Sequence, residues 1–162
     1  MKHDTLIATQ PTPPRIASQR LWRAIALLAA AWALPAGTAC AQSPARQSAP
    51  KGAQVYFHYP LDGLRVPERF TVRIGLKEMG VAPAGIDKAL TGHHHLLIDS
   101  DPGPPDQPIP SDYNNIHLGN GQTEVVVTLP KGTHTLQLLL GDYTHTPHSP
   151  PVMSRKITVY VR

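Results

Sequence analysis

The sequence predicts an all-β fold, a small immunoglobulin-like β-sandwich of six to eight strands that follows a cleaved signal peptide. Two observations predict the sandwich. Short segments beyond residue 50 alternate apolar and polar residues and are rich in β-branched side chains, as half-buried strands are. The 18 prolines and 12 glycines interrupt the chain so often that long helices have little room. A third observation, a basic segment followed by an apolar run, predicts the signal peptide.

The signal peptide is expected over residues 1–41. Its basic residues Arg15, Arg20 and Arg23 precede the apolar run 24–34, which is shorter than the roughly 20 residues of a membrane-spanning helix. The small residues "ACA" at 39–41 then form a cleavage site. We therefore expect an exported, periplasmic protein without a transmembrane segment. A lipoprotein acylated at Cys40 is the less favoured alternative, because no leucine lies three positions upstream.

Cleavage changes the charge and the cysteine content of the chain. The net charge of the full chain is +4, and the signal peptide removes Lys2, Arg15, Arg20 and Arg23 together with Asp4. The mature net charge of about +1 does not favour a nucleic-acid partner. Cys40 is the single cysteine, so a mature chain beginning near Gln42 has neither a disulfide nor a thiolate site.

The mature chain is expected to contain a polar tether over residues 42–52 and one domain over residues 53–162. The tether sequence "QSPARQSAPKG" has no apolar period. Strands are expected at 54–59, 69–76, 93–99, 123–129, 134–140 and 155–161, with a short extended piece at 115–118. Residues 60–68 contain Asp-Gly and two prolines, which are typical of a connecting turn.

The segment 125–140 predicts a hairpin with its turn at residues 130–133. In this arrangement Leu129 lies opposite His134, and Val127 lies opposite Leu136 on the core face. His134 then sits at the edge of the core. This position favours a structural histidine bonded to a backbone group.

The run "TGHHHLLID" at residues 91–99 carries three consecutive histidines. Because side chains on a strand alternate between two faces, His93 and His95 share one face and are about 6.5 to 7 Å apart. His94 projects with Leu96 and Ile98, so we expect it to be buried and hydrogen-bonded. The pair on the first face is at most half of a metal site.

Two further segments supply candidate ligands. The proline-rich loop 141–154 carries Asp142, His145 and His148, and His117 precedes a glycine turn. Imidazole and carboxylate together suit Zn(II) or Cu(II), whereas two methionines beyond residue 41 do not support a thioether-rich Cu(I) site. The candidate metal ligands are therefore His93, His95, His117, Asp142, His145 and His148.

Other functions remain open at this level. Asp99 and Asp101 imitate the start of a calcium loop, but prolines follow and the closing glutamate is missing. The chain has no catalytic motif of the common hydrolase or nucleotide-binding classes, so we expect no enzyme. The alternative to metal binding is a binding or interaction module for an envelope protein or a glycan, in which the histidines are structural.

Several stretches together resemble a known family. They are "MGVAPAG" (79–85), "TGHHHLLID", "IHLGNGQTE", "GTHTLQLLLGDYTHTPHSPPVMS" (132–154) and "ITVYV". In order and wording they are similar to the bacterial exported family called domain of unknown function 4399. The resemblance implies a small exported domain and assigns no activity or catalytic residue. It does place the histidine-bearing segments within the family pattern.

Overall fold

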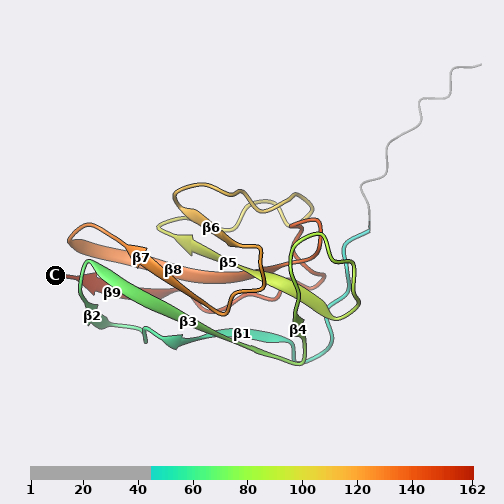
Figure 1. Ribbon diagram of the computed structural model, residues 1–162, viewed down its shortest axis with the longest axis horizontal. Helices are drawn as coiled ribbons and strands as arrows, with labels where there is room; N and C mark the ends of the chain where they lie inside the picture. The colour runs from blue at the N-terminus through green and yellow to red at the C-terminus, as the bar shows by residue number, and fades with distance from the viewer. Residues whose placement is uncertain (1–44) are drawn as a thin grey trace, which may run out of the picture. The chain divides into compact units, whose positions relative to one another are not determined.

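A computed structural model describes residues 45–162, and these residues form nine strands and no helix (Figure 1). The strands are β1 (Gln54–Tyr59), β2 (Leu64–Val66), β3 (Arg69–Lys77), β4 (Gly80–Val81), β5 (Thr91–Ile98), β6 (Asn115–Leu118), β7 (Glu124–Thr128), β8 (Gly132–Gly141) and β9 (Ile157–Val161). The predicted signal peptide over residues 1–41 and the acylation alternative at Cys40 lie outside the described residues. The all-β prediction is confirmed for the part of the chain that the structure covers.

The strands form two sheets that enclose one main core. The smaller sheet has the order β1-β3-β7, and the larger has the order β2-β9-β8-β5-β4, with β6 beside β5. The pairs β2 with β9 and β4 with β5 are parallel, and the others are antiparallel. Both sheets contribute to the core, which includes Val72 and Val127 from the smaller sheet and Leu136 and Val159 from the larger.

Strand β3 shows how the sequence makes a half-buried strand. Phe70, Val72 and Ile74 are buried. Arg69, which precedes Phe70, and Arg73, which lies between Val72 and Ile74, are exposed. Burying each large apolar side chain of this kind contributes about 1.5–3 kcal/mol. The alternation therefore fixes which face of the strand meets the core.

The predicted hairpin of β7 with β8 is wrong. Strand β7 pairs with β3, so that Val127 lies opposite Phe70, whereas β8 pairs with β5 and β9 in the other sheet. The assignment of faces holds, because Val127 and Leu136 are both buried in the main core. Period two identifies the buried face of a strand but not its hydrogen-bonding partner. The chain crosses from one sheet to the other at residues 129–131.

Strand β5 differs from the others because all eight of its residues are buried. One face meets the main core through Leu96 and Ile98. The other face meets a smaller apolar cluster made by Leu97, Ile109 and Leu139. Ile109 belongs to the segment after β5, so chain outside the sheets covers this second face. The site described below lies on it.

Part of the predicted tether packs on the domain. Ser48 forms a β-bridge with Ser149, the Ala49 amide donates to the Ser149 carbonyl at 3.0 Å, and Ala49 is buried. The Arg46 side chain donates to the carbonyls of Pro147 and His148. Residues 46–49 thus fasten the end of the histidine-bearing loop to the domain.

Candidate metal centre

Three histidines from two neighbouring strands lie on the second face of β5. His93 and His95 share this face because they are two residues apart. In the antiparallel pairing of β5 with β6, His95 lies directly opposite His117. Paired residues in adjacent strands point to the same face of the sheet, so the pairing adds His117 to the two histidines of β5.

The ligand atoms of these three side chains converge. One nitrogen from each of His93, His95 and His117 lies within 4.8 Å of the others. The Nε2 atoms of His93 and His95 are 3.0 Å apart. Two imidazole nitrogens bound to one ion at about 2.05 Å are separated by about 2.9–3.4 Å for angles of 90–109°. The pair is therefore spaced as two ligands of a single ion would be.

All three imidazoles favour the neutral form, which is the form that binds metals. Burial, followed by the neighbouring imidazoles, lowers the pKa of His93 to about 4 and that of His95 to about 3. The pKa of His117 is also lowered, by burial and then by His145. At neutral pH a cation therefore does not have to displace protons from these rings.

Most of the unpaired buried side-chain atoms of the described residues belong to this strand pair. His93 Nδ1, His95 Nδ1 and His117 Nε2 have no hydrogen-bond partner, and neither ring nitrogen of His94 has one. Leaving a buried polar group unpaired costs about 1–3 kcal/mol. The cluster therefore destabilises the protein by itself. An ion bound through Nε2 of His93 and His95 would not pair their Nδ1 atoms, so it would offset this cost only through its own binding energy.

Two glycines make room for the rings. A Cβ atom at Gly119 would lie 2.2 Å from Cε1 and 2.4 Å from Nε2 of His117. A Cβ atom at Gly141 would lie 3.0 Å from Nε2 of His95. The backbone at both positions forms part of the wall against which the imidazoles pack, a role that the histidine pattern alone did not reveal.

The loop after β8 brings a fourth imidazole to the cluster. The ring centroid of His145 lies 4.8 Å from that of His117 and 5.0 Å from that of His93. Asp142, also a predicted ligand, is buried, and its Oδ1 accepts hydrogen bonds from the Thr144 amide at 2.8 Å, the Thr144 hydroxyl at 2.7 Å and the Thr146 amide at 3.0 Å. Through Oδ1 it organises the loop. The pattern Asp-x-Thr-x-Thr in "DYTHT" is the sequence signal for this arrangement.

Comparison with known families identifies the family to which the chain belongs. Residues 72–162 match the sequence profile of the family described as a domain of unknown function, DUF4399. The chain belongs to the DUF4399 family. No curated protein and no solved structure matches it. The matched region of the DUF4399 domain contains every histidine of the cluster, whereas β1 and β2 precede it.

Two other histidines of the DUF4399 domain are buried but lie apart from the cluster. His148 Nε2 is 3.1 Å from the Thr91 carbonyl oxygen, and Nδ1 is 3.5 Å from that of Leu140, so a ring N–H of His148 has a backbone carbonyl to donate to. His94 is fully buried in the main core, as expected. The expected hydrogen bond of His94 is not found, because its cross-strand neighbours Leu118 and Leu140 offer only apolar side chains.

His134 is the structural histidine that the sequence predicted at the edge of the core. Its Nδ1 is 2.6 Å from the Asp99 carboxylate, and its Nε2 is 2.9 Å from the Pro130 carbonyl oxygen. Burial alone would lower the pKa of His134, but these two hydrogen bonds and the Asp99 charge raise it. The predicted backbone bond is present, and a carboxylate completes the arrangement.

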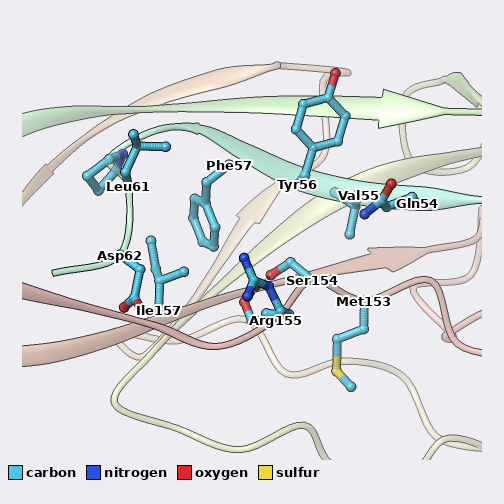
Figure 2. A pocket seen from close by; sticks show the side chains of 11 residues that line it. Gln54, Val55, Tyr56, Phe57, Leu61, Asp62, Met153, Ser154, Arg155 and Ile157 are labelled. Atoms are coloured by element: carbon cyan, nitrogen blue, oxygen red, sulfur yellow. Dashed lines mark hydrogen bonds between the residues drawn. The ribbon is translucent and has the colours of Figure 1, made fainter. Parts of the chain in front are cut away.

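A pocket of about 240 Å³ lies between β1 and residues 153–157. Figure 2 shows Phe57 of β1 and Arg155 reaching into it from its two sides. No histidine lines this pocket, so it is separate from the metal centre.

Among the described residues of the DUF4399 domain, no helix is long and apolar enough to cross a membrane.

Proposed function

We propose that this DUF4399 domain binds a transition-metal ion, Cu(II) or Zn(II), through His93, His95 and His117. The convergence of two fully buried imidazoles and one partly buried imidazole within ligand distance of one another carries the proposal. Imidazole is the ligand type that Zn(II) and Cu(II) share. The rings favour the neutral form, and their outer nitrogens have no protein partner.

The energetic cost of the cluster supports binding over a purely structural role. A hydrogen-bonded core histidine, such as His148, has a backbone carbonyl within hydrogen-bonding distance of a ring nitrogen. His93 and His95 share one contact between their Nε2 atoms and leave both Nδ1 atoms unpaired. Replacing such a cluster by apolar residues would stabilise most proteins. A gain on binding an ion is the simplest compensation.

The proposal includes export to the periplasm. Its support is the basic and apolar pattern of residues 1–41 described above.

The immunoglobulin-like type of the sandwich is part of the same proposal. Its support is the strand order, with β1, β3 and β7 in one sheet and β5, β8 and β9 in the other, which corresponds to strands A, B, E and C, F, G of that type.

The test is a metal titration of the protein, expressed as the full chain and purified without a polyhistidine tag. We expect a Kd for Zn(II) or Cu(II) below about 10 μM, equivalent to about −7 kcal/mol. At a free metal concentration 100 times the Kd, the free energy of unfolding should rise by about 2.7 kcal/mol. Binding weaker than about 10 μM for both ions would refute the proposal and favour the non-metal interaction module.

A matched pair of variants makes the titration specific. His95→Ala removes a buried imidazole of the cluster, whereas His58→Ala removes an exposed imidazole of β1. We expect the first change to weaken binding by at least about 100-fold, beyond the 10- to 100-fold typical of outer-shell changes, and the second to leave it unchanged. Equal affinities in the two variants would mean that the metal binds elsewhere.

A further inference from the structure

Four imidazoles, rather than three, surround a common centre. The ring centroids of His93, His95 and His117 are 4.9 to 5.0 Å apart in every pair. His145 adds separations of 5.0, 6.1 and 4.8 Å to these three rings in the same order. Five of the six separations are therefore nearly equal, so the centroids form a tetrahedron that is opened along the edge from His95 to His145.

The separations can be compared with those that two coordination geometries require. With a metal–nitrogen bond of about 2.05 Å, a ring centroid lies about 3.2 Å from the ion. Four imidazoles then have centroids about 5.2 Å apart in a tetrahedron. In a square plane, four separations are about 4.5 Å and two are about 6.4 Å. A single long edge matches the tetrahedron better than the square.

The backbone of the loop is shaped to place His145 there. His145 has a φ of 70°, a left-handed conformation that is costly for a residue with a side chain. The loop fixes this conformation on both sides. The His145 amide donates to the Asp142 carbonyl at 2.9 Å, and the His145 carbonyl accepts from the Ile109 amide at 2.9 Å. The conformation is thus held by the surrounding structure, which is the pattern expected at a functional position.

We propose that His145 is the fourth ligand and that the four imidazoles form a closed tetrahedral centre, the geometry of Zn(II) rather than of Cu(II). This inference rests on the proposed function. His145 is half-buried in a loop, so its ring can turn about its side-chain torsions to bring a nitrogen to the ion. Asp142 is a positioning residue that holds the loop. A site with four protein ligands leaves no position for a reacting water, which is typical of structural or storage sites.

The first test replaces Zn(II) with Co(II) in the wild-type protein and in His145→Asn. Asparagine tolerates a left-handed backbone, so the loop conformation is retained while the imidazole is lost. We expect the wild-type Co(II) form to show the intense visible absorption of a four-coordinate ion. The spectrum of the variant should be shifted and weaker, because a water replaces the imidazole as a ligand of the ion. An unchanged spectrum in the variant would overturn the assignment of His145.

The second test compares Zn(II) and Cu(II) affinities in the same two proteins. Cu(II) binds more tightly than Zn(II) in most nitrogen sites, so the ratio of the affinities is the informative quantity. We expect His145→Asn to weaken Zn(II) binding at least about tenfold and Cu(II) binding less than about threefold. A Zn(II) affinity within about threefold of wild type would overturn the fourth-ligand assignment alone. If the wild type binds neither ion, the proposed function fails.

Discussion

The two faces of β5 carry histidines of the same burial but different surroundings. His93 and His95 project to one face and His94 to the other, and all three are fully buried. Across the neighbouring strands, His95 meets His117, whereas His94 meets Leu118 and Leu140. Unpaired ring nitrogens occur on both faces. Only the first face brings other imidazoles within reach, so only there can one ion satisfy several rings together.

The comparison teaches that a buried histidine is not a ligand by itself. His148 is as buried as His95, yet its ring lies within hydrogen-bonding distance of backbone carbonyls. What distinguishes the candidate centre is the convergence of several imidazoles, of which His93 and His95 contact each other through Nε2 and not a backbone carbonyl. Variants that make the two faces of β5 alike, or that alter one face alone, test this distinction.

The largest effect is expected from making the first face resemble the second. In the double variant His93→Leu with His95→Leu, metal binding should weaken by more than about 1000-fold. Two ligands are lost, and the loss of each ligand should weaken binding at least as much as the loss of a residue that only hydrogen-bonds to a ligand. The metal-free protein should become more stable by roughly 1–3 kcal/mol per unpaired nitrogen removed. Competition titration and urea unfolding measure the two effects. Metal binding that survives the double change would contradict the site.

A smaller effect is expected from the backbone wall of the first face. Gly119→Ala places a Cβ atom 2.2 Å from Cε1 of His117 and displaces the ring. We expect metal affinity to fall by about 10- to 100-fold, as it does when ligand orientation is disturbed. Gly103→Ala is the control, because no atom lies within 4 Å of its added Cβ. Isothermal titration should show no change for the control, and equal losses would rule out displacement of His117 as the cause.

The second face should respond in stability and not in binding. His94→Leu removes two unpaired buried nitrogens from the main core. At about 1–3 kcal/mol for each nitrogen, the free energy of unfolding should rise by about 2–6 kcal/mol. The side chain projects away from the cluster, and metal affinity should stay within about threefold of wild type. Urea denaturation of the metal-free protein and a parallel titration measure these outcomes. A large loss of affinity would show that the two faces are not independent.

The smallest effect concerns the pair of Asp99 and His134, which lies outside both faces. The pKa of His134 is raised, so its contribution is complete below about pH 6.5 and is lost as pH rises through the raised value. Burial alone would raise the pKa of Asp99, but its hydrogen bonds to His134 and Thr135 lower it. Its contribution is therefore complete above about pH 4 and is lost as pH falls through the lowered value.

The test of this pair is the pH dependence of stability in wild type and His134→Gln. The Asp99 side chain is 41% exposed, and exposed ion pairs contribute at most about 1 kcal/mol. We expect wild type to exceed the variant by up to about that amount between about pH 4 and 6.5, with a smaller difference on either side. Thermal unfolding at several pH values measures this. A difference that does not depend on pH would mean that the contribution of His134 is not ionic.

Much of the fold could be predicted because successive side chains alternate between the two faces within each strand. The alternation in β7 and β8 identified the residues that face the main core, and the same rule separated His94 from His93 and His95. Pairing could not be predicted in this way. The faces of β7 and β8 were assigned correctly while their partners were not, since Val127 is buried equally well opposite Leu136 or opposite Phe70.

The sequence by itself determined the all-β class, the positions of seven of the nine described strands and the division of the histidine triplet, because these depend on residues close together in the chain. The short strands β2 and β4 were missed, and β2 lies in the segment that was predicted to be a connecting turn. Tertiary structure decided which candidates meet. The pairing of β5 with β6 sets His117 beside His95, the loop held by Asp142 places His145 over the same rings, and the Thr91 carbonyl lies within hydrogen-bonding distance of His148. Each outcome depends on contacts between residues distant in sequence, and no local periodicity encodes their register.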